Sequence, residues 1–181
     1  MLSRWRRITN LISEKDFNRV WERHIEDSIS LLHLCPYSRR WLDIGSGAGF
    51  PGIVIGIILT ELDGQIHCVE SDGRKCAFLR EVARELQIPV KVHNLLAENL
   101  SPHLTGAVDV VTARAFASVT RILHICDPYL STGAVAVLPR GKAATWEAEK
   151  LDATRYTVEI NDNPIHKDGA LICIRERLKD T

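Results

Sequence analysis

Short apolar runs alternate with longer amphipathic stretches through most of the chain. Five of the runs are typical of strands, at residues 41–44, 66–70, 90–93, 108–112 and 134–138. The stretches between them repeat apolar residues every three or four positions, which predicts helices at 51–61, 73–86 and 118–130. This order of elements is typical of a parallel sheet covered by helices on both faces. We therefore expect an α/β fold with a doubly wound, Rossmann-like sheet.

The first 36 residues precede this alternation and predict a helical extension. Apolar residues at helical spacing place two helices there, at about 1–14 and 17–34. The apolar stripe of the second helix includes Trp21, and Pro36 ends the helix. A chain of 181 residues has a size suited to one domain, with N-terminal helices in 1–36 and the α/β core in 40–181.

The other end of the chain departs from the alternation in a different way. A helix is expected at 143–153, and two apolar strands follow it, at 156–160 and 170–175. No helical stretch separates these strands, so they predict a hairpin that adds an antiparallel edge to the sheet. This ending favours the methyltransferase variant of the fold, because a nicotinamide-binding domain more often continues with parallel units.

The most informative chemistry lies between the first predicted strand and the first core helix, in the sequence WLDIGSGAGFPG at 41–52. Glycines adopt positive φ readily and let a ligand approach the backbone. The start of the following helix offers unpaired N–H groups and a partial positive charge. A cradle for a nucleotide or nucleoside is therefore predicted at the four glycines, Gly45, Gly47, Gly49 and Gly52.

Two ligand classes compete for this cradle. From Gly47 the glycines follow the G-x-G-x-x-G pattern of dinucleotide-binding folds, and Glu70 ends the next strand near the expected spacing. From Asp43 they follow D-x-G-x-G-x-G, a pattern of S-adenosylmethionine-dependent methyltransferases. An acid in front of the glycines suits a ligand with an α-amino group and a sulfonium better than a pyrophosphate. We favour the methyltransferase, and an NAD(P)-dependent oxidoreductase is the alternative.

The carboxyl ends of the other strands supply further candidates, because ligands of open α/β sheets bind there. Glu70 follows the second strand and suits ribose hydroxyls, whereas Ala97 and Glu98 follow the third and suit an adenine edge. Arg114 follows the fourth strand and is expected to face the same crevice. The loop after the fifth strand adds two basic residues, Arg140 and Lys142.

Composition further narrows the class of protein and its expected partners. The 23 Lys and Arg are matched by 23 Asp and Glu, so overall charge does not attract nucleic acid, and any such contact depends on local clusters. Five cysteines without a C-x-x-C pair predict buried thiols in a reducing compartment. The start of the chain lacks the apolar segment of a signal peptide, and the apolar run at 52–62 is too short for a bilayer. We expect a cytoplasmic protein without membrane contact, metal centre or obligate protein partner.

Several longer stretches identify a specific resemblance. They occur in order along nearly the whole chain, at 21–28 (WERHIEDS), 42–52 (LDIGSGAGFPG), 70–75 (ESDGRK), 78–86 (FLREVAREL) and 110–115 (VVTARA). The chain resembles the family of bacterial small-subunit (16S) ribosomal RNA methyltransferase G, also called glucose-inhibited division protein B. This resemblance implies methyl transfer from S-adenosylmethionine to N7 of a guanine in the 530 loop of 16S rRNA, free or within the 30S subunit.

The resemblance also implies roles for single residues. Cofactor contacts carry over onto Gly45 and Phe50 of the glycine turn and onto Ala97, Glu98 and Arg114, with Gly47 and Glu70 added by analogy of fold. Guanine N7 carries a free lone pair, so no general base and no catalytic side chain is expected. The RNA-facing rim is expected to hold Arg23, His24, Asp27, Arg140 and Lys142.

Two departures from the family pattern bear on the RNA contacts. The family usually has more residues before the point where this chain starts, so we expect an N-terminal helix to be missing or shortened. The family's L-K-G after the fifth strand reads Leu138-Pro-Arg-Gly141 here, and arginine keeps the charge but not the geometry of lysine. A non-catalytic protein that binds RNA or assists ribosome assembly is therefore a second alternative.

Overall fold

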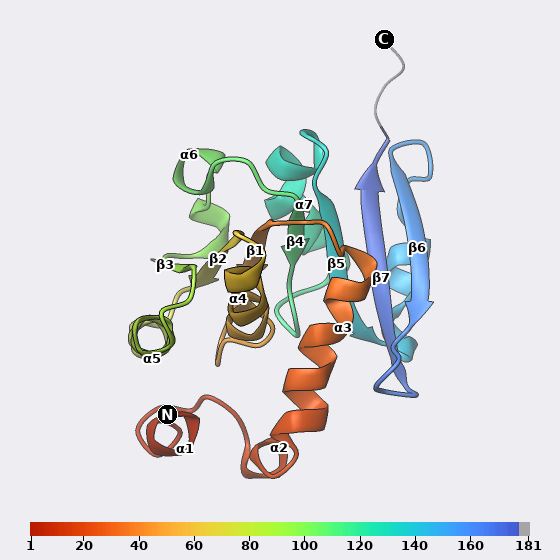
Figure 1. Ribbon diagram of the computed structural model, residues 1–181. Coiled ribbons are helices and arrows are strands. Elements are labelled where there is room, and N and C mark those ends of the chain that lie inside the picture. Colours follow the sequence, from red (N-terminus) through yellow and green to blue (C-terminus); the bar gives the residue numbers. More distant parts are fainter. Residues whose placement is uncertain (178–181) are drawn as a thin grey trace.

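The computed structural model describes residues 1–177, and the last four residues of the predicted domain lie outside that range. One seven-stranded sheet in the order β3-β2-β1-β4-β5-β7-β6 forms its centre (Figure 1). The first five strands are parallel, whereas β7 is antiparallel to both β5 and β6. The strands span Arg40–Ile44 (β1), Gln65–Glu70 (β2), Val90–Asn94 (β3), Val110–Thr112 (β4), Val135–Gly141 (β5), Tyr156–Asp162 (β6) and Gly169–Glu176 (β7).

The strand order confirms the predicted doubly wound sheet with a C-terminal antiparallel hairpin. The chain builds outward from β1 to β2 and β3 on one side, and then returns to add β4 and β5 on the other side. The strand order therefore reverses between β1 and β4, and the carboxyl ends of these two strands open the crevice where such folds bind ligands. Gly45 follows β1 and Ala113 follows β4, so the glycine turn and Arg114 meet at this crevice.

Helices cover both faces of the sheet, as the alternation of apolar runs predicted. One face packs against α3 (Asp27–Leu34), α4 (Gly52–Glu61) and α5 (Gly73–Leu86). The other face packs against α7 (Val119–Leu130) and α8 (Trp146–Glu149). Residues of β1 alternate between the two cores, because successive side chains of a strand point to opposite faces: Trp41 joins the first core and Leu42 the second.

The N-terminal region differs from the two helices expected there. It contains α1 (Leu2–Trp5), α2 (Glu14–Phe17), a π-helical segment (Trp21–Glu26) and then α3. A π-helix has more residues per turn than an α-helix, so it shifts the faces of the chain on either side of it. Trp21 is consequently 68% exposed instead of lying on an apolar stripe, and Asp27 is buried. In Figure 1 α1 and α2 lie below the core, at the carboxyl ends of the parallel strands.

Two short segments also differ from expectation. The helix expected at 143–153 is a 3-10 turn (Lys142–Ala144) followed by the single turn of α8. Asp152 accepts hydrogen bonds from the N–H and hydroxyl of Thr154, and this local turn competes with helix propagation. Two unpredicted segments lie between β3 and β4: a 3-10 turn (Ala97–Asn99) and α6 (Pro102–Thr105), capped by Ser101.

Residue burial fits the expectation for the cysteines. All five cysteines are buried free thiols. Among residues 1–177, no helix has the length and apolar character needed to cross a membrane.

Candidate functional site

The glycine turn after β1 has a backbone that only glycine adopts easily. Gly45, Gly47 and Gly49 have φ values of +71°, +55° and +86°. The N–H groups of Gly45 and Ser46 donate to the carbonyl of Val69 at 2.9 and 3.0 Å, which ties the turn to the end of β2. A Cβ at Gly45 would lie 2.5 Å from the Phe116 ring. The turn therefore combines positive φ with close packing against the loop after β4.

Asp43 supports this turn from beneath. Its side chain is only 1% exposed, and Oδ2 accepts a hydrogen bond from the Gly52 N–H at 3.1 Å. Burial raises the pKa of Asp43 to about 7, whereas hydrogen bonds from Ser46 and Gly52 act in the opposite direction. The sequence suggested that this acid faces the ligand. In the structure Asp43 lies behind the turn. It is a residue of β1, and its side chain points into the core and not towards the ligand side of the turn.

A hollow of about 400 Å³ lies beside the turn, and we call it the Glu70 hollow. Oε2 of Glu70 accepts from the Gly47 N–H at 2.9 Å, and Oε1 accepts from the Asp72 N–H at 2.9 Å. These bonds hold the carboxylate at the wall and still leave lone pairs for a ligand. Five of the seven predicted cofactor residues line this hollow: Gly45, Gly47, Glu70, Ala97 and Glu98.

Two details of the Glu70 hollow were not foreseen. The Glu98 side chain pairs with Arg121, whose Nε donates to Oε1 at 3.1 Å, so the carboxylate is already engaged. Phe116 forms part of the wall and packs against Gly45, although the sequence analysis did not select it. Its position two residues after Arg114, beyond the end of β4, was the available signal.

A second hollow of about 410 Å³, which we call the Phe50 hollow, lies between the glycine turn and the N-terminal region. The Phe50 ring stacks on His24, with ring centroids 4.7 Å apart and an interplanar angle of 21°. Burial, followed by the positive charge of Arg114, lowers the pKa of His24 to about 4. His24 is thus neutral at physiological pH. Its Nδ1 lies 2.5 Å from Nη1 of Arg114 and must accept, because a guanidinium only donates.

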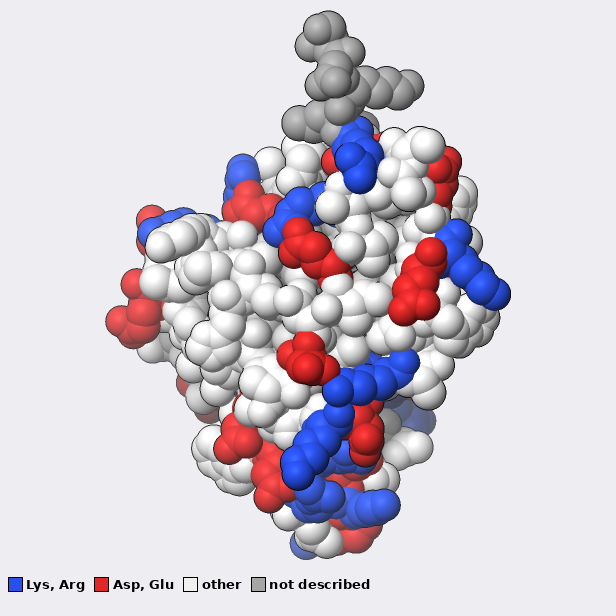
Figure 2. Space-filling model, turned by 90° about the vertical axis from the view of Figure 1, so that its right-hand side faces the viewer, with Lys and Arg blue, Asp and Glu red and all other residues white. Residues whose placement is uncertain are grey.

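A third hollow of about 520 Å³, the basic hollow, lies on the other side of Arg114. Its wall is formed by the N-terminal region, the end of β5 and the loop between β6 and β7. Figure 2 shows Lys and Arg side chains gathered towards the lower end of the molecule, beside several acidic ones. Five basic residues line this hollow, Arg19, Arg23, Arg114, Arg140 and Lys167, against two acidic ones, Asp27 and Asp168, so basic residues predominate there in a chain with no net charge.

The five residues expected at an RNA-facing rim have different positions. Arg23 lines both the Phe50 hollow and the basic hollow. Arg140 lines the basic hollow, but its guanidinium donates to the carbonyls of Ala113, Pro139 and Ala117 at 2.9 to 3.1 Å. Lys142 is partly exposed and pairs with Asp162 at 2.6 Å, away from the three hollows.

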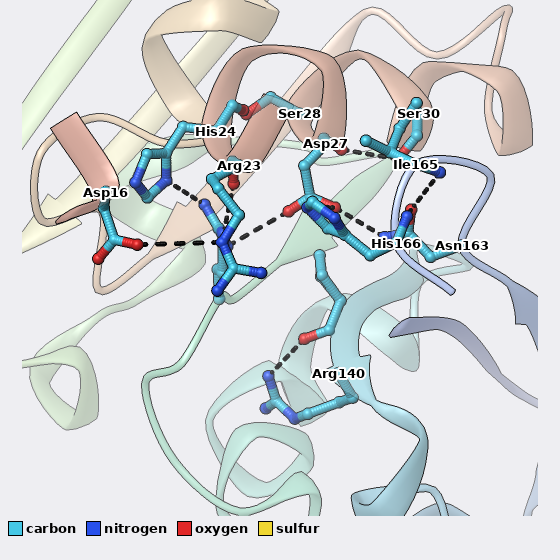
Figure 3. Close-up of polar contacts among 12 residues, drawn as sticks. Asp16, Arg23, His24, Asp27, Ser28, Ser30, Arg140, Asn163, Ile165 and His166 are labelled. Carbon is cyan, nitrogen blue, oxygen red and sulfur yellow. Dashed lines mark hydrogen bonds and ion pairs between the residues drawn. The ribbon is translucent and has the colours of Figure 1, made fainter. Parts of the chain in front are cut away.

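The π-helical segment turns His24 and Asp27 inward, so that His24 lines the Phe50 hollow and Asp27 lines the basic hollow. Asp27 is 4% exposed, so only a small part of it reaches the surface of the basic hollow. Its Oδ2 lies 3.4 Å from Nε of Arg114, and its Oδ1 accepts from the Asn163 side chain at 2.7 Å (Figure 3). Asn163 was missed by the sequence analysis. The Asn-Pro dipeptide at 163–164 signalled a turn but gave no sign of a partner in α3.

The three hollows form a series that meets at Ala115. This residue has φ of +48° and lines all three, whereas Arg114 lines the Phe50 hollow and the basic hollow. A carboxylate suited to hydroxyl groups lies at one end, arginines suited to a carboxylate lie in the middle, and a basic wall lies at the other end. The series can hold an extended nucleoside-containing ligand next to an electron-rich or anionic partner.

Comparison with known proteins identifies the relatives of this chain. The family model described as rRNA small subunit methyltransferase G matches residues 1–170. A protein named ribosomal RNA small subunit methyltransferase G from Methylorubrum populi is 42% identical over 161 residues, which cover 88% of this chain and 76% of that protein. A protein of the same name from Caulobacter vibrioides is 36% identical over 177 residues, covering 97% of this chain and 80% of its own.

Solved structures share the fold at much lower identity. An rRNA methylase from Streptococcus thermophilus superimposes with a TM-score of 0.58 at 11% identity, covering 84% of this chain and 94% of that one. The S-adenosylhomocysteine-bound methyltransferase PaMTH1 from Podospora anserina has a TM-score of 0.62 at 14% identity, with coverage of 83% and 76%. At these identities the likeness concerns the fold alone.

Proposed function

This chain belongs to the rRNA small subunit methyltransferase G family, and we propose that it transfers the methyl group of S-adenosylmethionine to N7 of a guanine in the 530 loop of 16S rRNA. The observation that carries the proposal is the series of three hollows that meet at Ala115. Membership of this family favours the methyltransferase over the oxidoreductase and over a binder without activity.

The Glu70 hollow and the Phe50 hollow fit the two halves of the cofactor. The Glu70 carboxylate has lone pairs for ribose hydroxyls, and Ala97 and Glu98 border the same hollow where an adenine edge would lie. A Cβ at Gly47 would meet only the Gly45 carbonyl, at 3.8 Å, so the surface there is open to a ligand. Arg114 and Arg23 border the Phe50 hollow and suit the carboxylate of the methionine half.

The basic hollow is the proposed site of the target guanine. Bound S-adenosylmethionine would supply an electrophilic methyl group to guanine N7, whose lone pair needs no deprotonation, and S-adenosylhomocysteine would be the leaving group. The chain therefore contributes mainly alignment and fixed dipoles. Arginine side chains suit the O6 and N7 edge of guanine and the neighbouring phosphates, and Arg19 and Arg23 border this hollow, where they pair with Glu22 and Asp16.

The form of the substrate and the compartment complete the proposal. We infer that the RNA partner is 16S rRNA, either free or in the 30S subunit, and that the protein acts in the cytoplasm where that RNA is found. The buried thiols agree with a reducing compartment.

Tritium transfer from labelled S-adenosylmethionine tests the proposed function. The acceptors are 30S subunits and free 16S rRNA that lack the modification, and the labelled base is then mapped. We expect label on N7 of the 530-loop guanine, and the better acceptor identifies the substrate form. Label on another base would contradict the substrate, and absence of both transfer and S-adenosylhomocysteine binding would contradict the function itself.

A further inference from the structure

We propose that Asp27 is a positioning residue for cofactor binding: its buried carboxylate aligns the Arg114 guanidinium to receive the carboxylate of the cofactor's methionine half. This inference rests on the proposed function, because it takes S-adenosylmethionine as the ligand of the Phe50 hollow. Asp27 itself does not line that hollow, so it acts through Arg114.

The contacts of Asp27 join three parts of the chain that are distant in sequence. Asp27 starts α3, Arg114 follows β4, and Asn163 follows β6. Asn163 donates to Oδ1 of Asp27 at 2.7 Å, and its own side-chain oxygen accepts from the N–H groups of Ile165 and His166 at 2.8 and 3.1 Å (Figure 3). The carboxylate is thus held in place from the hairpin side, which leaves Oδ2 directed at Arg114.

Arg114 is held on three sides. An arginine side chain has five N–H groups. Within residues 1–177 its Nε lies 3.4 Å from Asp27, Nη1 lies 2.5 Å from Nδ1 of His24, and Nη2 donates to the Arg23 carbonyl at 2.7 Å. His24 and the Arg23 carbonyl take two of the five groups and Nε faces Asp27 in an ion pair, which leaves one N–H on each terminal nitrogen. Two such groups on the end of a guanidinium form the fork that binds a carboxylate with two parallel hydrogen bonds.

Asp27 has a distinct part in this arrangement because its carboxylate contacts the guanidinium, whereas Asp16, which also lines the Phe50 hollow, pairs with Arg23 at 3.9 Å. His24 is neutral and the Arg23 carbonyl is uncharged, whereas the Arg23 side chain adds a second positive charge nearby. The Arg114 side chain is only 25% exposed, and a mostly desolvated guanidinium without a charged partner is disfavoured, so loss of the carboxylate releases Arg114 towards solvent. The fork would then no longer face the Phe50 hollow, and the cofactor carboxylate would no longer contribute to binding affinity.

The affinities of the protein for two ligands distinguish this positioning role from a general effect on folding. S-adenosylhomocysteine carries the amino-acid carboxylate, whereas 5′-methylthioadenosine has the same nucleoside and sulfur without it. In the full chain, we expect Asp27→Asn to raise the Kd of S-adenosylhomocysteine about tenfold and to change that of methylthioadenosine less than about twofold, measured by titration calorimetry. An equal loss for both ligands, or no loss for either, would overturn the proposal.

Asp109→Asn is the matched control. Asp109 accepts from the backbone N–H groups of Arg39 and Arg40 and from the Arg40 side chain, at the opposite edge of the sheet. Its loss removes a comparable acid–arginine contact, so we expect lower thermal stability with the ratio of the two affinities unchanged. If Asp109→Asn also changed the ratio of the S-adenosylhomocysteine and methylthioadenosine affinities, that ratio would depend on the stability of the fold. The assignment of this effect to Asp27 would then be overturned.

A double-mutant cycle with Arg114→Gln tests whether Asp27 acts through Arg114. In the Arg114→Gln background, we expect Asp27→Asn to cause less than about a twofold further loss of S-adenosylhomocysteine affinity. A further tenfold loss would show independent action.

If Asp27→Asn does not fold, Asp27→Glu replaces it as the test. This variant keeps the charge and moves it by one methylene, so we expect a selective loss of S-adenosylhomocysteine affinity of about threefold; no selective loss there would contradict the proposal. If the wild-type chain binds neither ligand, the cofactor itself is wrong, and that outcome differs from every failure of Asp27.

Discussion

Gly45 shows at the scale of one residue how backbone conformation and site shape depend on each other. We expect Gly45→Ala to lower the free energy of unfolding by about 1–3 kcal/mol, because the side chain adds strain at φ of +71° and meets Phe116 at 2.5 Å. The displaced ring forms a wall of the Glu70 hollow, so binding of S-adenosylhomocysteine should weaken at least about tenfold. Urea denaturation and calorimetric titration measure the two effects.

Gly133→Ala provides the control for that variant. Gly133 also has positive φ, +97°, but a Cβ there meets nothing within 4 Å. It should therefore lose stability through backbone strain and keep its cofactor affinity. If Gly45→Ala also kept its affinity, the contact between Gly45 and Phe116 would have no part in shaping the hollow.

His67 and His93 give the molecule a predictable response to pH. The rings stack 5.0 Å apart, with Nδ1 of His67 2.8 Å from Nε2 of His93. Burial, then the charge of His93, lowers the pKa of His67 to about 4, from 6.5. The unfolded chain therefore binds a proton before the folded chain does, and stability falls as pH is lowered from about 6.5 to about 4. We expect His67→Gln to reduce this slope by up to about 1.4 kcal/mol per pH unit.

Denaturation curves between pH 4 and pH 7 measure that slope. Asp43 acts in the opposite direction, since its pKa is raised to about 7 and its buried carboxyl favours the protonated, low-pH state. Because this contribution is common to both proteins, the difference between wild type and His67→Gln isolates the histidine. Exposed His124 in α7, changed to Gln, controls for the substitution itself. An unchanged slope in His67→Gln would contradict the assignment.

The sequence predicted much of the site at this scale because its residues follow strand ends, and strand ends were recognisable. Gly45, Gly47, Glu70, Ala97 and Glu98 come together for that reason. Burial of Asp27 was not predictable in the same way. A carboxylate on a helix is usually solvated, and its partners Arg114 and Asn163 are separated from it by 87 and 136 residues (114 − 27 and 163 − 27).

At the scale of elements, the π-helical segment decides which side chains of the N-terminal region point inward. A periodicity of 3.6 residues predicted Trp21 inside and Asp27 outside, and the structure has the opposite arrangement. No local pattern of apolar residues marks a π-helical segment, since its extra residue per turn is stabilised by tertiary contacts. Here the Arg23 carbonyl, within that segment, accepts from Arg114.

The loop between β4 and α7 is a second element whose position depends on one side chain. Arg140 ties the Ala113 and Ala117 carbonyls to the end of β5, and Ala115 lies between them. We expect Arg140→Lys to slow single-turnover methyl transfer by about tenfold to a hundredfold and to leave RNA affinity almost unchanged, because a lysine cannot reach both carbonyls in the same geometry. Rapid-quench assays and filter binding separate the two quantities.

Lys142→Ala is the comparison for Arg140→Lys. It removes a positive charge from the same loop, but Lys142 pairs with Asp162 outside the three hollows. Its transfer rate should match that of the wild type. If Arg140→Lys lost RNA affinity to the same extent as rate, Arg140 would contact the RNA, as the sequence first suggested.

At the scale of the whole molecule, the sheet was predictable from the sequence, whereas the short helices that flank it were less predictable. Five parallel strands and the closing hairpin follow from apolar runs and the absence of a helix between the last two. The single turn of α8 and the broken N-terminal helices could not be predicted from apolar runs. Their lengths depend on local hydrogen bonds to side chains, such as those that Asp152 accepts, and on contacts made across the crevice.

Charge distribution is also a property of the whole molecule. Equal numbers of acidic and basic residues give no long-range attraction to RNA, whereas the basic hollow supplies a local one. We therefore expect contact with phosphates at the edge where β4 and β5 end. Such a layout favours recognition after encounter over steering from a distance.

The meeting of three hollows at Ala115 has a consequence for inhibitor chemistry. A single synthetic molecule that joins adenosine, an amino-acid linker and a purine could occupy all three at once. Each part would raise the effective concentration of the others, so the joined compound would bind more tightly than its fragments. Selectivity over other enzymes with this sheet would come from the linker, which would lie against Phe50, His24 and Arg114.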